Sequence, residues 1–320
     1  MPKQTGGLAL WAAMGTIYVV WGSTYLGIAI SIETIPPFLS AALRFAIAGA
    51  VLFGWEVLRA GRGFRLPSLR EWRDSAIVGT LLLGIGNGFV ALAEQTVPSG
   101  IAAILIALIP LWFAVLGRLY FGDPFPRLIL IGIAIGLTGV VLLVWPFGDG
   151  ANAIDLFGVA ILLAASLGWA HGSLFSARKA KLPARPLMAS GLQMLLGSVA
   201  LFVEAGVTGE LGRFRPEAVS ASSLWALAYL TVIGSLVAFN AYAWLLRNAP
   251  LSLVGTYAYV NPVVAVVLGG LILAEPITPR TLVASAVIVV AVAMIVTVRG
   301  RMARTGQPPV ADLDRAPARA

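Results

Sequence analysis

Ten long apolar stretches run along the chain, separated by short polar connections. Each is about 20 residues long, the length that an α-helix needs to cross the hydrocarbon core of a membrane. They cover residues 8–30, 37–58, 74–93, 98–120, 127–146, 155–177, 186–206, 221–245, 250–272 and 279–298. The pattern predicts an all-α integral membrane protein with ten transmembrane helices.

The polar residues at the C-terminus break this pattern. Residues 299–320 are rich in Pro, Arg and Ala, and a segment of this kind cannot bury enough apolar surface to fold. We expect a disordered cytoplasmic tail there. The first apolar stretch continues into Trp21 and Tyr25 without an obvious small-residue cleavage site, so we expect it to be retained as a helix.

An internal repeat divides the chain into two related halves. Three prolines and one acidic position recur with a constant shift: Pro98, Pro110, Asp123 and Pro124 correspond to Pro250, Pro262, Glu275 and Pro276. Proline is tolerated at a helix start and kinks a helix interior, so each half, 8–146 and 155–298, is expected to contain one kinked helix. Because each half has an odd number of helices, five, the second half starts on the opposite membrane face. Two inverted five-helix repeats are typical of secondary transporters, whose binding site lies near the midplane.

The basic residues set the expected orientation. With the N-terminus inside, 18 of the 22 Lys and Arg residues fall in inner segments, and only Arg213, Arg215 and Arg280 fall in outer ones. The remaining residue, Arg44, lies within the second helix. Cytoplasmic loops carry the excess of Lys and Arg in membrane proteins, so both termini are expected to be cytoplasmic. The net charge of +8 is explained in this way, and no nucleic-acid partner is expected.

The amino-acid composition excludes several kinds of functional site. The chain is 59% hydrophobic and 11% charged, against roughly 25% charged residues in a soluble domain. It has no cysteine and one histidine, and its acidic residues are not clustered, so neither a thiol-based site nor a metal site is expected. It also lacks a GxxxxGK[ST] loop, so ATP is not expected to drive it. No cofactor is predicted.

Several motifs point to one family. They are Trp21-Gly22-Ser23-Thr24-Tyr25, Pro37 followed by Arg44-Phe45, Pro98 to Pro110, Tyr257 to Pro262, and Ala274-Glu275-Pro276. With these motifs the chain resembles the ten-helix EamA family of the drug/metabolite transporter superfamily over about residues 8–298. The resemblance implies a multi-pass exporter of the bacterial inner membrane. It also implies a central cavity lined by helices 1–4 and 6–9, with helices 5 and 10 at the periphery.

Arg44 is the leading candidate for a substrate-binding residue. It lies seven residues after Pro37, about 10 Å into the second helix, and a charge at that depth is costly and normally faces the bundle interior or water. It can attract a substrate carboxylate or move a gate, or it can serve structure by bonding broken backbone near the helix 4 kink. The matching residue of the second half is the neutral Gln193, seven after Pro186, so the expected site is asymmetric.

Aromatic residues form a second candidate group for substrate binding. Tyr18 and Trp21 share one face of the first helix and lie too deep for the interfacial belt that Tyr and Trp usually mark. Trp169 in the sixth helix is the repeat partner of Trp21. These rings can form a wall against an apolar or cationic substrate, or they can serve ordinary helix packing.

Four more residues are candidates for substrate binding. Asn87 and Asn240 are mid-membrane and must satisfy their amides inside the bundle, so they either contact substrate or bridge helices. Tyr257 and Asn261 lie one turn apart in the ninth helix beside Pro262. Asn261 can also satisfy carbonyl groups that the proline kink frees.

Two residues are candidates for proton coupling. In small four-helix relatives, a carboxylate in helix 1 exchanges protons and cations, but helix 1 of this chain has no acid. Glu94 or His171 would then have to take that role, or transport is uncoupled. A lone histidine can change charge near neutral pH, but is more often a hydrogen-bond partner between helices.

Taken together, these observations predict a secondary transporter that exports small amphipathic metabolites, such as amino acids, by alternating access around a central cavity. The alternative is a proton-coupled multidrug or organic-cation exporter. An integral-membrane enzyme would need clustered acids, histidines or an activated nucleophile. The apolar helices carry scattered single polar residues instead, so no enzymatic activity is expected. The expected partners are a small-molecule substrate and the lipid bilayer. The chain is expected to be a monomer or a homodimer, since Gly132, Gly136 and Gly139 form a close-packing face that suits contacts within the monomer or between two copies.

Overall fold

A computed structural model describes residues 7–61, 64–144 and 155–304, and every regular element in those residues is a helix. In this described part of the chain, eight helical segments are long and apolar enough to cross a membrane, and two shorter apolar helices, Arg127–Leu143 and Tyr257–Ile272, accompany them. The predicted fold class, ten transmembrane helices in two inverted halves, is confirmed.

The first half begins with two unbroken helices, whereas its third and fourth spans are each built from more than one element. Its elements are α1 (Gly7–Ser31), α2 (Pro37–Ala60), α3 (Leu69–Gly79), η2 (Thr80–Gly88), α4 (Phe89–Ala93), α5 (Ser99–Ile106), α6 (Ile109–Phe121) and α7 (Arg127–Val144). The third span starts earlier than predicted because Ser68 and Glu71 form a capping box that begins α3.

The second half repeats this order. Its elements are α8 (Leu156–Arg178), α9 (Pro186–Val207), the short α10 (Glu210–Arg213) and η3 (Pro216–Ala218), α11 (Ala221–Tyr229), η4 (Leu230–Phe239), α12 (Asn240–Asn248), α13 (Leu251–Val254), α14 (Tyr257–Ile272) and α15 (Pro279–Arg304). The third helix of each half therefore contains a π-helical stretch at its centre, η2 or η4. Such wide turns are rare and often occur at functional sites.

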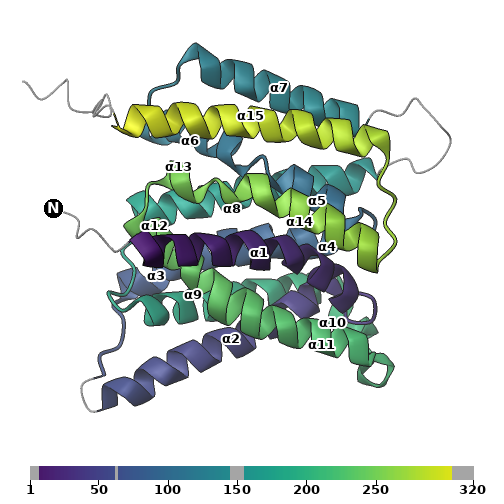
Figure 1. Cartoon of the computed structure of the whole chain (residues 1–320). Helices are drawn as coiled ribbons and strands as arrows, with labels where there is room; N and C mark the ends of the chain where they lie inside the picture. The colour runs from purple at the N-terminus through teal and green to yellow at the C-terminus, as the bar shows by residue number, and fades with distance from the viewer. Residues whose placement is uncertain (1–6, 62–63, 145–154, 305–320) are drawn as a thin grey trace, which may run out of the picture.

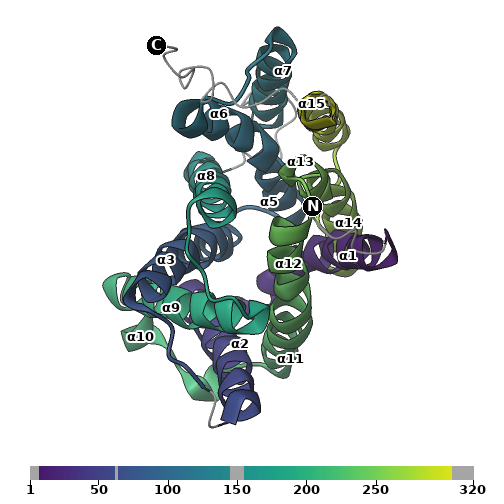
Figure 2. The same cartoon turned by 90° about the vertical axis from the view of Figure 1, so that its left-hand side faces the viewer.

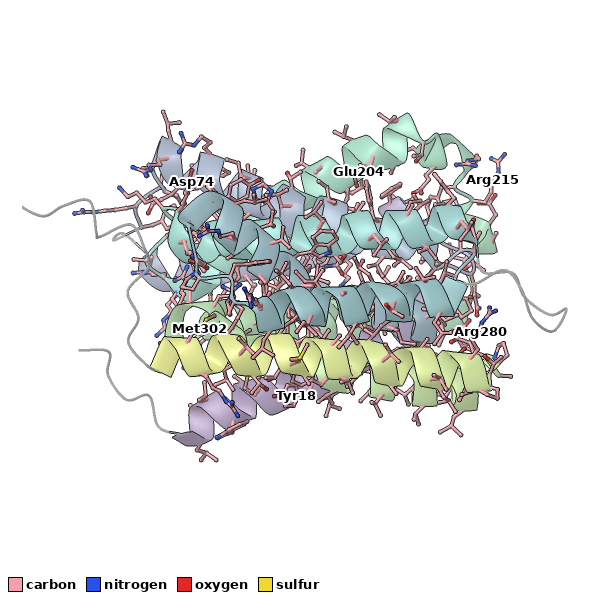
Figure 3. All side chains as sticks on the ribbon, turned by 90° about the horizontal axis from the view of Figure 1, so that it is seen from above. Tyr18, Asp74, Glu204, Arg215, Arg280 and Met302 are labelled. Atoms are coloured by element: carbon pink, nitrogen blue, oxygen red, sulfur yellow. The ribbon has the colours of Figure 1, made fainter. Side chains whose placement is uncertain are left out.

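Helices α1 and α8, which open the two halves, run in opposite directions through the bundle (Figure 1). We call the end that holds the start of α1 and the end of α15 the inner end, and the opposite end the outer end, following the orientation predicted from the basic residues. Asp74 and Met302 lie at the inner end and Arg215 and Arg280 at the outer end, with an apolar band between them (Figure 3).

The fourth and ninth spans are interrupted close to their middle prolines. In the fourth span the helix breaks at Ala107 and Leu108, and Pro110 is the second residue of α6. In the ninth span the break lies at Gly255 and Thr256, whereas Pro262 is inside α14. Both breaks lie on the N-terminal side of the proline, because its ring crowds the preceding turn and its nitrogen cannot donate a hydrogen bond.

Helix α9 crosses α2 and α3 at very short range. A Cβ atom on Gly49 of α2 would lie 2.8 Å from the backbone nitrogen of Leu195, and one on Gly79 of α3 would lie 2.3 Å from the carbonyl oxygen of Gln193. Glycine permits backbones to approach this closely at membrane helix crossings. These crossings fix α9 as the contact between the two halves on that side of the bundle.

Helices α7 and α15, the last of each half, pack against each other at the edge of the bundle (Figure 2). Gly132 and Gly139 face Ile295 and Ile288 of α15 at distances that leave no room for a side chain. The glycine face of α7 therefore serves packing within the monomer, one of the two roles predicted for it.

The start of the predicted C-terminal tail needs correction. Helix α15 continues to Arg304, past residue 299, where the tail was expected to begin. Arg299 donates to the carbonyl oxygen of Phe113 at 2.8 Å and to the carboxylate of Asp123 at 2.9 Å. These bonds hold the extra turn against the bundle. The rest of the predicted tail, residues 305–320, lies outside the described residues.

Candidate substrate cavity

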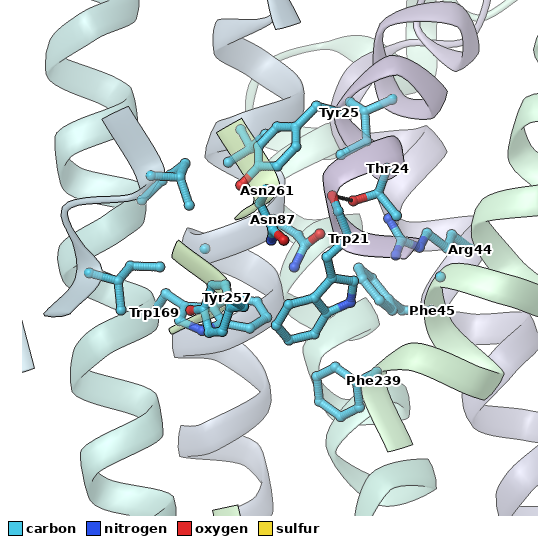
Figure 4. Close-up of a pocket in the computed structure, with 17 residues that line it drawn as sticks. Trp21, Thr24, Tyr25, Arg44, Phe45, Asn87, Trp169, Phe239, Tyr257 and Asn261 are labelled. Atoms are coloured by element: carbon cyan, nitrogen blue, oxygen red, sulfur yellow. Dashed lines mark hydrogen bonds between the residues drawn. The ribbon is translucent and has the colours of Figure 1, made fainter. Parts of the chain in front are cut away.

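A cavity lies inside the bundle, between helices of both halves (Figure 4). Its volume of about 60 Å³ has room for a few water molecules. It is lined by Trp21, Thr24, Tyr25, Ile28, Arg44, Phe45, Gly86, Asn87, Val90, Ile106, Ile109, Ala165, Trp169, Gly234, Phe239, Tyr257 and Asn261. These residues come from seven of the eight helices that were expected to line it. Helix α9, the seventh span, contributes none, because its glycine crossings place it against α2 and α3.

Four aromatic rings from four helices meet at one side of the cavity. Trp21 makes edge-to-face contacts with Trp169 and Tyr257, each with ring centroids 5.3 Å apart. Tyr242 of α12 stacks 4.7 Å from Trp21 at a tilted angle, and its hydroxyl bonds to Ser173 at 2.7 Å. Such geometry favours aromatic pairs beyond the area they bury. We call these four residues, Trp21, Trp169, Tyr242 and Tyr257, the aromatic cluster.

Arg44 brings a positive charge to the cavity wall. Its side chain comes from α2, is 5% exposed, and donates through Nε to Ser235 of η4 at 2.7 Å. A Cβ atom on Gly234 would lie 2.8 Å from Nη2, so the glycine leaves room for the guanidinium. Figure 4 shows the guanidinium ending near Thr24 and Trp21. Within the described residues, no carboxylate lies within 4.0 Å of it. A ligand carboxylate would supply the missing counter-charge.

Two asparagines lie on other walls of the cavity. Asn87 belongs to η2 and donates weakly to the carbonyl oxygen of Leu82, at 3.4 Å. With its side-chain amide turned so that the nitrogen faces these acceptors, Asn261 donates to the carbonyl oxygens of Tyr257 and Tyr18 at 3.2 and 3.1 Å. Asn261 therefore joins α14 to α1 beside the Pro262 turn and also faces the cavity.

Three of the predicted binding residues lie outside the cavity lining. The Tyr18 hydroxyl shares a 2.6 Å hydrogen bond with Thr256, so it joins α1 to the break before α14. Gln193 is buried where α9 crosses α3. Asn240 donates to the carbonyl oxygen of Leu236 in its own helical span at 2.8 Å. Each is engaged in contacts within or between helices.

The two candidates for proton coupling occupy opposite ends. Glu94 directly follows α4 near the outer end, and neither of its carboxyl oxygens has a hydrogen-bond partner among the described residues. His171 of α8 lies 5.2 Å from the ring of Tyr120, between ring centroids, and is not part of the cavity lining. Of these two candidates, only Glu94 has buried side-chain oxygens without a partner in the described part of the chain.

The sequence reasoning missed several lining residues. Thr24 and Tyr25 were part of the motif around Trp21, and Phe45 is adjacent to Arg44, so their helix positions gave a usable signal. Tyr242, which packs against Trp21 and Trp169 but is not among the lining residues, gave no such signal, because its repeat counterpart in the third span is Val90. Gly234 and Phe239 face the cavity through the π-helical turns of η4, which a regular helical spacing does not reproduce.

The described residues give no group of three or more His, Asp or Glu side chains that could bind a metal ion. The chemistry of the cavity is that of recognition: aromatic faces on one side, a guanidinium on another, and two amides between them. Such a site suits a small molecule with both an apolar and an acidic part.

Known proteins resemble this chain along most of its length. The profile of the EamA-like transporter family matches residues 8–145 and again 156–297. The Uncharacterized inner membrane transporter YedA of Escherichia coli K12 is 40% identical over 290 residues, which are 90% of each chain. A Probable amino-acid metabolite efflux pump of Salmonella typhimurium is 26% identical over 330 residues, covering 96% of this chain and 99% of the pump.

One solved crystal structure shares the fold, with a TM-score of 0.64 and 21% identity over 93% of this chain and 99% of the other. The family match covers both halves, and the resemblance seen in the sequence motifs is confirmed. The protein is a membrane transporter and belongs to the EamA-like transporter family.

Proposed function

We propose that the protein exports small amphipathic metabolites that carry a carboxylate, amino acids among them, across a bacterial inner membrane with both termini in the cytoplasm. The substrate binds in the cavity, with its carboxylate at Arg44 and its remaining atoms against the aromatic cluster. The two halves, 8–146 and 155–298, rock about this site so that it opens to each side in turn.

Arg44 is the observation that carries the proposal. A buried charge in a membrane protein needs a partner, and its guanidinium has a hydroxyl group on one side and the cavity on the other. A carboxylate would fill that need, whereas an organic cation would be repelled. This argues against the organic-cation alternative, although aromatic rings alone would attract cations.

A zwitterionic amino acid fits both parts of the cavity. Its carboxylate would pair with Arg44, and its ammonium group would lie against an aromatic face or donate a hydrogen bond to the carbonyl oxygen of an asparagine side chain. The efflux pump of Salmonella typhimurium is named for amino-acid metabolites, which makes these compounds the first to test.

The small volume of the cavity supports alternating access. At about 60 Å³, it has room for a few waters and must widen to hold an amino acid. Both ends of the bundle are joined across the two halves, through Arg178 and Asp123 at the inner end and through Glu275 and Ser99 at the outer end. One of these ends has to separate before substrate enters.

Uptake into proteoliposomes tests the proposal. Pooled amino acids and organic cations are offered to the wild-type protein and to Arg44→Ala, and accumulation is read by mass spectrometry. We expect amino acids to accumulate with wild-type protein. Arg44→Ala should lower the rate about 10- to 100-fold, since a hydrogen bond to a charged group contributes about 1.5–3 kcal/mol.

Arg127→Ala is the matched control, because Arg127 is exposed at the start of α7 and its loss removes the same charge far from the cavity. It should transport like wild type. Normal amino-acid transport by Arg44→Ala would show that the guanidinium does not bind the substrate, and accumulation of cations alone would support the organic-cation alternative.

A further inference from the structure

Glu94 has a buried carboxyl group, and the proposed binding of substrate by Arg44 gives this group no role. It directly follows α4, and both of its carboxyl oxygens are inaccessible to water and lack a hydrogen-bond partner among the described residues. A carboxylate in that setting is much less stable than a neutral carboxyl group. A buried acid of this kind therefore favours a bound proton.

Glu94 lies between the cavity and the outer end. Val90, one helical turn before it on α4, lines the cavity. Tyr25 of α1 also lines the cavity and lies close enough to Glu94 to interact with it electrostatically. The acid is thus about one turn further out than the cavity wall.

A second glutamate, Glu275, lies close enough for its charge to act on Glu94, and it closes the outer end. Glu275, in the connection between α14 and α15, accepts hydrogen bonds from the backbone nitrogens of Ser99 at 2.8 Å and Gly100 at 3.1 Å. These are the first amides of α5, where the helix dipole favours a negative charge. Because Glu275 belongs to the second half and α5 to the first, this contact joins the halves. We call it the outer latch.

The inner end uses a different arrangement at the equivalent position. Asp123 corresponds to Glu275 in the repeat, but its carboxylate is held by the guanidinium groups of Arg178 and Arg299. An ion pair with two positive charges withstands an added negative charge better than a contact with amides does. The outer latch is therefore the end that a neighbouring carboxylate would open.

We propose that Glu94 is a proton-binding site and that its proton keeps the outer latch closed. This rests on the proposed transport function and adds the ion that regulates it. With the proton bound, Glu275 is the only carboxylate of the pair that is charged. When Glu94 loses its proton, two negative charges lie near each other, and their repulsion releases Glu275 from α5.

The other titratable and charged groups around Glu94 fit this assignment. Burial, and then the charge of Glu275, raise the pKa of Glu94 well above its usual value. Asp155, at the start of α8, is bonded to Thr96 at 2.6 Å, and Arg44 of α2 is bonded to Ser235. Tyr25 of α1 is a further titratable neighbour.

The sign of the pH effect follows from linkage. In the closed state the buried acid holds its proton tightly, and in the open state water reaches it and it releases the proton more easily. Opening is therefore coupled to proton loss, and the open fraction rises by up to about tenfold per pH unit. Proton binding from the outer side closes the latch, which suits export driven by proton entry.

Hydrogen–deuterium exchange at Ser99 and Gly100 measures the latch directly. The full-length protein is placed in lipid nanodiscs without substrate, and exchange of the peptide holding these amides is followed by mass spectrometry. The pH is varied between about 6 and about 9, where carboxyl groups of ordinary pKa stay ionised. Rates are corrected for the intrinsic pH dependence of exchange. In wild type the corrected rate should rise with pH, and in Glu94→Gln it should stay low throughout.

Glu204→Gln is the matched control. Glu204 of α9 also has a buried carboxyl oxygen without a partner among the described residues, but the charge that acts on it is that of Glu210, which bonds to the start of α2. Its replacement should leave exchange at Ser99 and Gly100 as in wild type. Equal exchange in wild type and Glu94→Gln at every pH would overturn the proposal.

Transport separates this proposal from the one on which it rests. Wild-type proteoliposomes should accumulate amino acids faster with an imposed pH gradient, and Glu94→Gln should lose that gradient effect. If amino acids are transported but the gradient has no effect in wild type, the role of Glu94 is wrong and the carrier function stands. If no amino acid is transported but exchange at the latch follows pH through Glu94, the substrate assignment is wrong instead.

Discussion

Asp123 holds three helices together at the inner end. Arg178, at the end of α8, donates to both of its carboxylate oxygens at 2.8 Å, and Arg299 of α15 donates to one of them at 2.9 Å. Asp123 itself follows α6, so the three residues join the ends of three helices from both halves. Charge-assisted and bidentate bonds of this kind are among the stronger hydrogen bonds in proteins.

The ionisation of Asp123 makes part of the stability depend on pH. Burial raises its pKa, but hydrogen bonds from Arg178 and the charges of Arg178 and Arg299 outweigh this, so the pKa is below its usual value. The stabilisation is therefore present above the unfolded pKa of about 3.9 and is lost as the pH falls through the lower folded value.

Asp123→Asn should destabilise the protein by about 2 kcal/mol at neutral pH, because it removes charge-assisted hydrogen bonds. Its melting temperature in detergent, read by size-exclusion chromatography after heating, should also fall less than that of wild type on acidification. Glu217→Gln, which replaces an exposed acid of η3, is the control and should match wild type. Identical acid sensitivity in Asp123→Asn and wild type would contradict this account.

The position of a single residue at the cavity was predictable where its side chain was unusual for the apolar interior of a membrane. Arg44 and Trp21 drew attention because a charge and a large ring lay deep in apolar helices, and both line the cavity. Tyr242 and Gln193 show what the sequence could not predict. Whether a side chain in a helix faces the cavity or a neighbouring helix depends on packing, and Gln193 lies where the Gly79 crossing excludes it from the cavity.

At the scale of elements, the two π-helical stretches shape the cavity wall. Asn87 and Gly86 lie in η2, and Gly234 and Phe239 lie in η4. An additional residue per turn rotates the following part of the helix relative to a regular α-helix. Sequence spacing assumes regular turns, so it predicted that these spans exist and did not predict which of their faces meet the cavity.

Gly79→Ala tests the tightest helix crossing. Its Cβ would lie 2.3 Å from the carbonyl oxygen of Gln193 and 2.9 Å from the nitrogen of Gly197, so α3 and α9 would have to separate. We expect a loss of about 1–3 kcal/mol, as for other overpacked sites, and a lower melting temperature in detergent.

The control is Gly54→Ala, because Gly54 is also inside a helix and nothing lies within 4 Å of the added carbon. That change should raise stability slightly, since glycine in a helix costs roughly 0.5–1 kcal/mol relative to alanine. Equal melting temperatures of Gly79→Ala and Gly54→Ala would mean that the crossing of α3 and α9 tolerates a side chain.

At the scale of the whole molecule, the apolar pattern predicted the helices and the repeat predicted their inversion. Both are properties of long segments, where length and composition leave few alternatives. The C-terminal end of α15 was predicted less well, because contacts of Arg299 with Asp123 and Phe113 hold its last turn. Contacts between residues far apart in the sequence cannot be predicted from the composition of one segment.

The orientation predicted from the basic residues can be tested with reporter fusions. Green fluorescent protein fused after residue 320 should fluoresce and alkaline phosphatase fused there should be inactive, because positive residues retain their segments in the cytoplasm. Alkaline phosphatase joined after Arg215, in an outer connection, should be active. Phosphatase activity at the C-terminus together with inactivity at Arg215 would reverse the orientation.

The pairing of α7 with α15 imposes an order on synthesis. Helix α7 packs mainly against α15, yet α7 ends at Val144 and α15 begins only at Pro279. At roughly 5–20 residues per second, α7 waits in the bilayer for several seconds or longer before its partner emerges from the ribosome. During that time Gly132 and Gly139 face lipid or another protein, so the nascent chain presents an open helix-binding surface to the insertion machinery until its last segment arrives.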